Sequence, residues 1–385
     1  MTARIGGRSM RLGLHSGAAR RNVEGMKGAV IDSLESLGWN ASLEADRAAA
    51  RAAQAALAGL EPARVLSVHR GWCEVHDGRA AFLAKTASKL FHEDGGGPGL
   101  PATGDWVLLE EPRPPRPAAV AAILPRRTAL TRKEAGRATR AQTLAANADG
   151  VLVVMALVED FNIARLERYL ALVKSSGAPA CVVLNKADLL EPEDVAAAVA
   201  EVRAVALGAP VATVSAETGF GVERLGRMLE ARKTYAMIGS SGAGKSSLAN
   251  ALAGGEVMAV GEVRETDGRG RHTTSHRQML ALPSGALLID NPGLREVGLY
   301  GASEAQLAEV FADLLALAGG CKFRDCRHES EPGCAVLAAI EAETFDPDRL
   351  DSYRRLLEEA RGVSAAAAKR SERAGSLAMK RAKRR

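Results

Sequence analysis

A short glycine-rich stretch of this chain carries residues suited to holding a nucleotide. Residues 239–246 (Gly-Ser-Ser-Gly-Ala-Gly-Lys-Ser) fit the phosphate-loop pattern G-x-x-x-x-G-K-[ST] in full. Glycines let consecutive backbone N–H groups converge on phosphate oxygens, and the helix that follows adds its positive end. We expect Lys245 to reach the β- and γ-phosphates and the Ser246 hydroxyl to hold Mg²⁺. A strand-like run before the loop and a helical run after it favour this interpretation over a glycine-rich turn.

A second phosphate motif follows further along the chain. Asp290-Asn-Pro-Gly293 comes directly after the apolar run 286–289, 45 residues beyond Lys245. Alone, D-x-P-G is a common turn, but at the end of a strand it fits the D-x-x-G motif of phosphate-loop enzymes. We expect Asp290 to touch Mg²⁺ through water and the Gly293 N–H to sense the γ-phosphate.

Two further motifs indicate guanine as the base. Asn185-Lys186-Ala187-Asp188 fits N-K-x-D at the end of a strand. A carboxylate there accepts two hydrogen bonds from guanine that adenine cannot offer, and a missing buried partner discriminates by several kcal/mol. Ser215-Ala216, which also ends a strand, is expected to place a backbone N–H near guanine O6.

A nucleotide site of this kind has one more element that responds to the γ-phosphate and Mg²⁺, which should be a threonine between the phosphate loop and Asp290. Residues 268–275 (Gly-Arg-Gly-Arg-His-Thr-Thr-Ser) supply it, with Thr274 preferred over Thr273 as the Mg²⁺ ligand. Many related enzymes orient the attacking water with a Gln directly after D-x-x-G, but here that place holds Leu294. His272 is the nearest replacement, since a neutral imidazole accepts a proton or orients water. A packed loop histidine is the alternative, and slow intrinsic turnover is expected.

The motifs come in an unusual order, because N-K-x-D precedes the phosphate loop instead of following it. The chain therefore leaves Asp290 directly for its C-terminal part, and we expect nucleotide contacts to reorient residues 300–360. The catalytic group is expected to be His272, Lys245 and Thr274. The expected nucleotide contacts are Asn185, Lys186, Ala187, Asp188, Ser215, Ala216, Gly239, Ser240, Ser241, Gly242, Ala243, Gly244, Lys245, Ser246, Ser247, Asp290 and Gly293.

A cluster of cysteines predicts a metal centre. Three of the five cysteines fall within fourteen residues, and Cys321, Cys326, His328 and Cys334 form a Cys₃His set. Such a set suits tetrahedral Zn²⁺ and leaves no open position, so the site should be structural. The C-x-H step is unusual, but scattered free cysteines would not cluster in this way. With no secretory signal, the cysteines favour a reduced cytoplasm over disulfides.

The predicted secondary structure changes along the chain. Residues 28–60 are Ala-rich and predicted helical, and short strand-like runs between 63 and 126 predict a small β-barrel of OB or SH3-like type. From 151, strands at 151–157, 180–184, 211–215 and 235–238 alternate with helices at 162–175 and 191–206, and 278–290 predicts a hairpin. That alternation indicates a doubly wound parallel sheet. Helices are expected over 303–317 and 336–360.

Composition points to a globular protein with a basic end. Hydrophobic residues make up 47% and charged residues 25%, and no apolar run approaches the length that spans a bilayer, so we expect a soluble protein. The net charge is +5, and residues 369–385 carry eight Lys or Arg against one acid. The tail is either a solvated end or a contact for a polyanion such as RNA. No function is assigned to residues 1–27.

Together these motifs resemble the ribosome small-subunit-dependent GTPase family, the bacterial circularly permuted GTPases that mature the 30S subunit. The resemblance runs from about residue 33 to 360. Besides the motifs above, it is carried by the stretches 124–133, 142–149 and 215–221. It implies a multidomain chain: an N-terminal OB-type β-barrel, a central α/β circularly permuted P-loop GTPase domain and a C-terminal α-helical zinc-binding domain. The expected boundaries are 1–62 for an N-terminal extension, 63–126 for the OB-fold, 127–299 for the GTPase domain, 300–360 for the zinc domain and 361–385 for the basic tail.

The resemblance also implies a GTPase that binds the 30S subunit and its 16S rRNA late in maturation, with hydrolysis stimulated by the subunit. His272 matches the histidine proposed as catalytic in that family. We expect a cytoplasmic monomer with one structural Zn²⁺ and with Mg²⁺ accompanying GTP. One rival is a small-molecule ATPase or kinase, in which N-K-x-D has no use. Another is an RNA-binding protein with a vestigial GTPase domain, for which the phosphate-loop lysine is dispensable.

Overall fold

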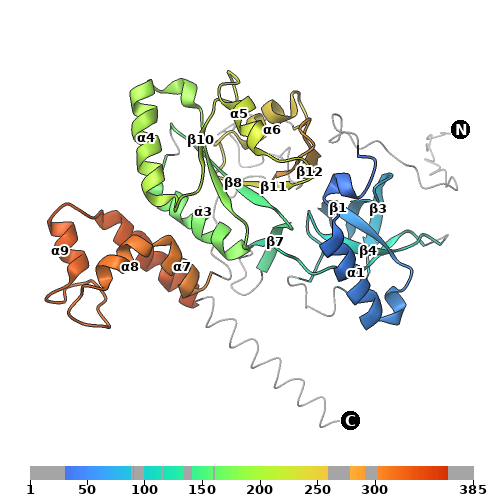
Figure 1. Cartoon of the computed structure of the whole chain (residues 1–385), viewed down its shortest axis with the longest axis horizontal. Coiled ribbons are helices and arrows are strands. Elements are labelled where there is room, and N and C mark those ends of the chain that lie inside the picture. Colours follow the sequence, from blue (N-terminus) through green and yellow to red (C-terminus); the bar gives the residue numbers. More distant parts are fainter. Residues whose placement is uncertain are drawn as a thin grey trace, which may run out of the picture.

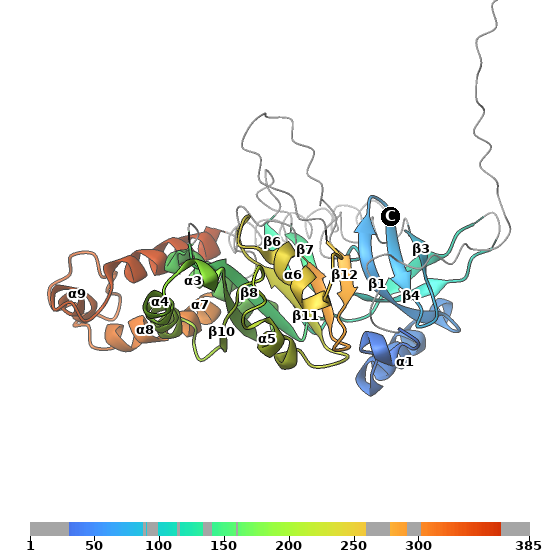
Figure 2. The same cartoon turned by 90° about the horizontal axis from the view of Figure 1, so that it is seen from above.

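A computed structural model of the chain describes residues 31–87, 90, 99–113, 116–133, 141–158, 161–258, 278–290 and 302–362. These form three units in a row, with a barrel at one end, an α/β unit in the middle and a helical unit at the other end (Figure 1, Figure 2). Within these ranges, no helix combines the length and apolar character that crossing a membrane requires.

The barrel is built from five strands of the described chain in the order β1–β2–β3–β5–β4, and β4 closes it by returning to β1. The strands are β1 (Glu61–His69), β2 (Trp72–His76), β3 (Ala81–Thr86), β4 (Trp106–Glu110) and β5 (Ala119–Ile123). Alternate residues point to opposite faces of a strand, so Ala63 and Val65 fill the barrel interior while Leu66 points out of it. The parallel pairing of β3 with β5 in a closed five-stranded order is that of an OB-fold, which confirms the predicted barrel type.

Residues before the barrel are less helical than predicted. A 3₁₀ turn, η2 (Glu35–Leu37), ends at Gly38, whose φ of 94° favours glycine. The helix α1 (Ala41–Ala53) then begins where the Asn40 side chain accepts hydrogen bonds from two backbone N–H groups. A second 3₁₀ turn, η3 (Ala55–Leu57), leads into β1.

The α/β unit has the predicted doubly wound sheet. Its strands are β8 (Gly150–Ala156), β9 (Ala180–Asn185), β10 (Val211–Thr213), β11 (Thr234–Ile238), β12 (Gln278–Ala281) and β13 (Leu287–Asp290). Its helices are α3 (Ile163–Ser176), α4 (Pro192–Val205), α5 (Val222–Met228) and α6 (Lys245–Ala253). Val151 and Val153 of β8 pack into one buried cluster and Leu152 and Val154 into another, so both faces of the sheet are covered. The strands predicted from the sequence and the 278–290 hairpin are all present.

A two-stranded sheet was not anticipated from the sequence. It pairs β6 (Ala129–Lys133) with β7 (Ala141–Ala146) and lies against α3. Both strands are rich in alanine and polar residues rather than β-branched ones, which explains why their strand character was not visible.

The helical unit departs from prediction because both of its long helices are broken. The first is split at Phe311 into α7 (Glu304–Val310) and α8 (Ala312–Ala318). The second consists of α9 (Ala335–Glu341) and a separate helix over 347–362. Pro347 opens that last helix, with the Asp346 side chain accepting a hydrogen bond from the Asp348 N–H at 2.8 Å. Proline suits the first turn of a helix but not its interior, so the break was readable in the sequence.

The barrel and the central sheet form one continuous hydrogen-bonded ladder. Ser67 of β1 pairs with Gln278 of β12, and Gln278 pairs on its other side with Asp290 of β13. One buried cluster also extends from Trp106 at the barrel through β8 and α3 to Phe311 in the helical unit. The three units are therefore packed together rather than strung on linkers.

Candidate nucleotide site and metal centre

The phosphate loop runs from Gly239 to Ser246 between β11 and α6, and its glycines are required by close contacts. A Cβ on Gly239 would lie 2.1 Å from the carbonyl oxygen of Val154. A Cβ on Gly244, where φ is 82°, would lie 2.3 Å from the side-chain nitrogen of Asn185. Substitution at either position must therefore displace the strand or side chain that lies against the loop.

Lys245 and Asp290 lie together beneath this loop. The Lys245 ammonium donates hydrogen bonds to the carbonyls of Gly239 at 2.9 Å and Ser240 at 2.6 Å. Asp290 ends β13 beside β11 and is 1% exposed; burial raises the pKa of its carboxyl group, and nearby Lys245 lowers it. Among the described residues, Oδ1 of Asp290 is buried without a hydrogen-bond partner. A buried, unpaired carboxylate oxygen beside a phosphate loop fits a hydrated Mg²⁺, which prefers oxygen ligands.

Asn185 links the phosphate loop to the predicted base-reading loop. Its side-chain N–H donates to the Ala243 carbonyl at 2.9 Å, and its side-chain oxygen accepts from the Ala216 N–H at 3.0 Å. The Ser215 hydroxyl in turn accepts a hydrogen bond from the Thr218 N–H at 3.0 Å and shapes the turn. Three segments far apart in sequence thus meet at the carboxyl edge of the sheet.

The other N-K-x-D residues lie beside this link. Lys186 has a left-handed backbone (φ 64°) that turns the chain into η4 (Ala187–Leu189), where the Ala187 N–H donates to Val214. Asp188 is exposed there. The remaining loop and α6 residues predicted to contact nucleotide are Ser241 and Gly242, which are exposed, and Ser246 and Ser247, which are half-buried.

Several predicted residues lie outside the described part of the chain. His272, Thr273 and Thr274 fall within 259–277, and Gly293 and Leu294 within 291–301. Their roles remain predictions.

The Cys₃His set is brought together in the helical unit. The ligand atoms of Cys321, Cys326, His328 and Cys334 all lie within 4.8 Å of one another. The sulfurs of Cys321 and Cys334 are 3.8 Å apart, and His328 Nδ1 lies 3.6 and 3.3 Å from these two sulfurs. Zn–S bonds of about 2.3 Å at tetrahedral angles place two sulfurs about 3.8 Å apart. The group could therefore hold a metal ion of that kind.

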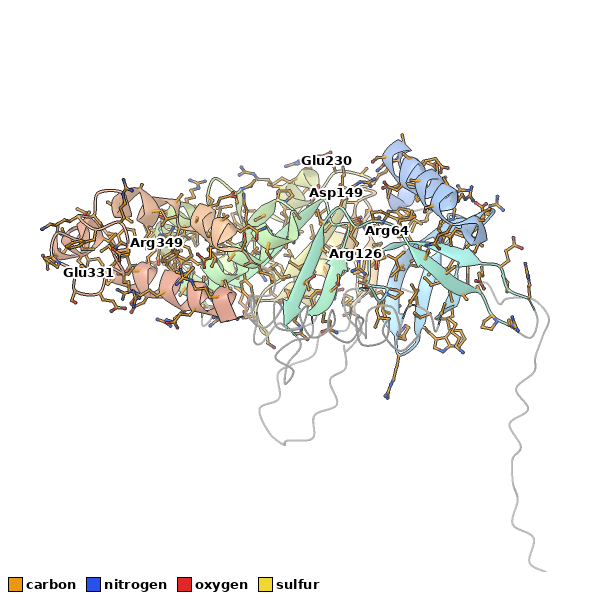
Figure 3. All side chains as sticks on the ribbon, turned by 90° about the horizontal axis from the view of Figure 1, so that it is seen from below. Arg64, Arg126, Asp149, Glu230, Glu331 and Arg349 are labelled. Atoms are coloured by element: carbon orange, nitrogen blue, oxygen red, sulfur yellow. The ribbon has the colours of Figure 1, made fainter. Side chains whose placement is uncertain are left out.

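Glu331, which the sequence analysis did not single out, organises the loop that carries His328. Glu331 lies in the helical unit (Figure 3). Its carboxylate accepts hydrogen bonds from the backbone N–H groups of Arg327 at 2.7 Å, Glu329 at 2.8 Å and Ser330 at 3.1 Å. These backbone donors, first that of Arg327, lower the pKa of Glu331 to about 2. An acidic residue inside a short Cys/His loop was the available sequence signal.

The fold and site together define a class of protein. The phosphate-loop strand β11 lies in the middle of the sheet, yet the strands that carry N-K-x-D and Ser215 come before it in sequence. This is a circularly permuted P-loop GTPase with a barrel before it and a metal-binding helical unit after it.

Comparison with known proteins agrees with that class. A family model described as RsgA GTPase matches residues 123–300. The "Small ribosomal subunit biogenesis GTPase RsgA" of Opitutus terrae is 44% identical over 336 residues, covering 85% of this chain and 89% of that protein. The protein of the same name from Streptomyces coelicolor is 46% identical over 328 residues, covering 85% and 86%. The crystal structure of YjeQ from Thermotoga maritima matches with a TM-score of 0.55 and 26% identity, covering 78% of this chain and 99% of that one.

The chain therefore belongs to the RsgA GTPase family, and it is a P-loop GTPase that hydrolyses GTP.

Proposed function

We propose that this GTPase binds the small (30S) ribosomal subunit, acts late in its maturation, and hydrolyses GTP faster when bound to it. The names of its relatives support the subunit as partner. The observation that carries the nucleotide assignment is the pair of hydrogen bonds through which Asn185 joins Ala243 to Ala216. They set the guanine-reading loop at a fixed distance from the phosphate loop, so one molecule of GTP spans both.

Each motif has a proposed role in that site. Asp188 accepts two guanine N–H bonds, and Lys186 lies against the base. The Ala216 N–H, which donates to Asn185, reaches guanine O6 through a shared hydrogen bond. The Lys245 ammonium, which donates to the loop carbonyls of Gly239 and Ser240, turns to the β- and γ-phosphates when GTP is bound.

The reacting end of the site is proposed to combine described and undescribed residues. Ser246 and Asp290 face the position that Mg²⁺ takes beside the phosphates, where the ion neutralises charge on the β- and γ-oxygens. Thr274 completes this set. His272 orients the attacking water or accepts its proton, since Leu294 has no group that can do so.

The metal centre is proposed to hold one structural Zn²⁺ through Cys321, Cys326, His328 and Cys334. The spacing of their ligand atoms supports it. The basic tail supports contact with 16S rRNA, since eight basic residues in 369–385 suit a phosphate backbone. We further propose that the protein is a cytoplasmic monomer.

The test is turnover of GTP and ATP by the purified protein, with and without purified 30S subunits. We expect GTP turnover to rise strongly with subunits and ATP turnover to stay at background. Asp188→Asn should lower GTP use by about 10⁴-fold and create use of xanthosine triphosphate, because an amide donates to the carbonyl that xanthine has in place of the guanine amine. Unchanged base choice in Asp188→Asn, or equal use of ATP, would contradict the assignment. A lack of stimulation would contradict the role on the subunit.

A further inference from the structure

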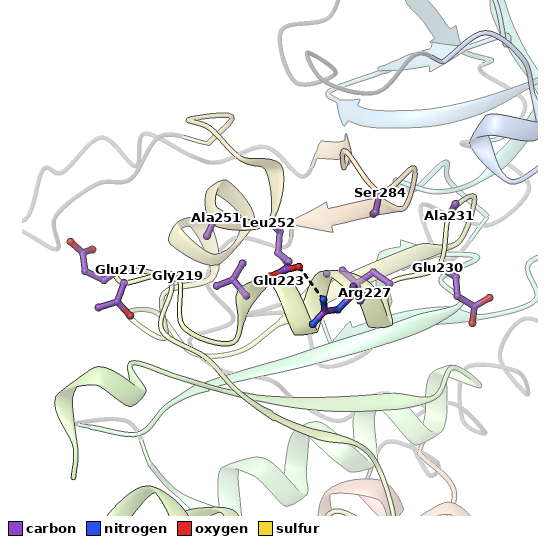
Figure 4. A pocket seen from close by; sticks show the side chains of 14 residues that line it. Glu217, Gly219, Glu223, Arg227, Glu230, Ala231, Ala251, Leu252 and Ser284 are labelled. Carbon is purple, nitrogen blue, oxygen red and sulfur yellow. Dashed lines mark hydrogen bonds and ion pairs between the residues drawn. The ribbon is translucent and has the colours of Figure 1, made fainter. Parts of the chain in front are cut away.

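The α/β unit has an open groove on its flank, outside the nucleotide contacts. It has a volume of about 900 Å³ and lies between α5 and α6, beside the base-reading loop and the β12–β13 turn (Figure 4). Its apolar side chains include Val222 and Leu229 of the α5 segment and Ala251 and Leu252 of α6. Among the described residues of the expected nucleotide set, Ala216 alone lines it.

One wall of the groove is a short helix. α5 has seven residues and ends at Met228, and the chain enters β11 at Thr234. A helix of two turns covers little of its neighbour, and the flank of α6 around Leu252 stays open. Gly226 deepens the groove, since a Cβ there would meet Leu252 at 3.8 Å.

Two exposed apolar side chains neighbour lining residues in sequence. Phe220, next to the lining residue Gly219, is 62% exposed, and Met228, between two lining residues, is 40% exposed. Exposed apolar side chains with a polar rim are typical of a site where another macromolecule docks. Exposed aromatic and methionine side chains are also enriched in the centres of protein interfaces.

The charge of the rim selects the kind of partner. Glu217 lies at one end of the groove and Glu230 at the other, with Glu223 between them (Figure 4). Arg227, the one cation among the described residues of the lining, is paired with Glu223 at 3.0 Å. This acidic groove belongs to a chain with a net charge of +5, so it differs in sign from the molecule as a whole. Carboxylates repel a phosphate backbone and attract lysine and arginine.

We propose that this groove is a docking site for a basic segment of a protein of the small subunit, one that inserts apolar side chains between α5 and α6. The proposal rests on the proposed binding of this GTPase to that subunit. Because Ala216 and Glu217 belong to both the groove and the base-reading loop, a docked segment also contacts the loop that holds guanine.

The first test places the photo-crosslinking residue p-benzoylphenylalanine at position 220 and irradiates the protein on purified 30S subunits. Leu207, 48% exposed and outside the groove, is the matched control position. We expect a crosslink from position 220 that protease removes and ribonuclease does not, with little product from position 207. A ribonuclease-sensitive crosslink, a crosslink to a second copy of this chain, or equal products from both positions would overturn the proposal.

The second test uses charge. Glu217→Lys/Glu230→Lys should weaken binding to the subunit by about tenfold at low salt, because both ends of the rim then repel a basic segment. Glu201→Lys/Glu341→Lys, at exposed positions outside the groove, makes the same change in net charge. Equal binding of the two variants would overturn the proposal. If the wild-type protein fails to co-sediment with subunits and is not stimulated by them, the proposed function fails with it. If binding and stimulation are intact but position 220 gives no crosslink, only the docking proposal for the groove is contradicted.

Discussion

Two buried arginines, Arg349 and Arg64, join the outer units to the GTPase domain, and they are held in different ways (Figure 3). Arg349, on the last helix, donates to both oxygens of Asp313 at 2.6 and 2.7 Å and to Glu167 of α3. Arg64, on β1 of the barrel, donates to the Thr234 hydroxyl at 3.1 Å and a backbone carbonyl at 3.3 Å. One cation has carboxylates as partners, and the other has neutral oxygens.

Their electrostatics differ accordingly. Burial lowers the pKa of Arg64 to about 10, since Asp149 and Asp105 offset the lost hydration only in part. Asp105 is itself bound by Arg126 through two hydrogen bonds of 2.7 Å. The pKa of Arg349 is raised: burial lowers it, but the two carboxylates outweigh burial. Burial of Arg64 is thus opposed only in part by nearby carboxylates, whereas the charged form of Arg349 is favoured by its two carboxylates. The compensation is one-sided, because burial still raises the pKa of the partner Glu167.

Each arginine marks a joint, meaning the contact between an outer unit and the GTPase domain. The comparison indicates which of the two joints is the more rigid. The helical unit shares a compensated charge network and a continuous apolar core with α3, so reorienting it as a body requires breaking both. This argues against the sequence-based expectation that nucleotide contacts reorient residues 300–360. The barrel shares the same apolar core through Trp106, but its buried arginine has neutral partners, so the polar contact at this joint is the weaker of the two.

The largest effect should come from removing the metal proposed for the helical unit. Cys326→Ser should raise amide exchange in α8 and α9 by 100-fold or more, about 3 kcal/mol, because a structural metal contributes folding energy to its domain. Hydrogen–deuterium exchange with mass spectrometry measures this, and barrel peptides serve as the internal control. Equal change in both units would mean that the helical unit is not metal-dependent on its own.

Arg349→Met should cost about 3 kcal/mol, because it leaves Glu167, 1% exposed, as a buried carboxyl group without its cation. Exchange in α3 and in residues 347–362 measures the loss. The double variant Arg349→Met/Glu167→Leu should recover most of it, since neither charge then remains. A double variant as unstable as the single one would show that packing, and not charge compensation, holds this joint.

Arg64→Met should cost less, about 1–2 kcal/mol, because the groups it leaves unpaired are a hydroxyl and a carbonyl. Part of that loss is its contact with the Trp106 ring, whose centroid is 4.8 Å from the guanidinium carbon. Exchange in β1 and β11 measures it, with Arg64→Lys as the charge-preserving control. A cost equal to that of Arg349→Met would contradict the inferred difference in strength between the two joints.

The smallest effect concerns pH. His76 is buried in the barrel with Nδ1 accepting from the Gly78 N–H at 3.0 Å, and burial lowers its pKa from the ordinary 6.5. The unfolded chain therefore binds the proton more readily, so stability is complete above about pH 6.5 and falls as the pH drops through the lowered value. Barrel exchange measured between pH 7 and 5 should rise, and His76→Gln should flatten that rise. A pH response unchanged by this substitution would assign it to other groups.

Much of this arrangement was predictable because its signals are local. The phosphate loop, Asp290 and the N-K-x-D strand were placed by short motifs that end apolar runs, and the structure puts them at one edge of the sheet. The Cys₃His set was likewise readable from spacing and is brought together.

What escaped prediction depends on contacts between distant segments. Nothing near Asn185 in sequence shows that its side chain joins Ala243 to Ala216, which are 58 and 31 residues away. Arg349 is one of many arginines until α3 places Glu167 beside it. The break at Phe311 similarly follows from its burial against the ring of Tyr353, with centroids 5.3 Å apart, and not from any local breaker.

The pairing of Gln278 with both Ser67 and Asp290 has a thermodynamic consequence. Adjacent strands lie about 4.8 Å apart, so the barrel backbone is about 10 Å from the Asp290 backbone, with one strand between them. A displacement of β12 is shared by both neighbours. If a molecule bound to the barrel displaces β12, its binding and the binding of nucleotide are coupled, and such coupling changes both affinities by the same factor. The strand β12 is thus placed to connect the barrel thermodynamically to the strand that carries Asp290.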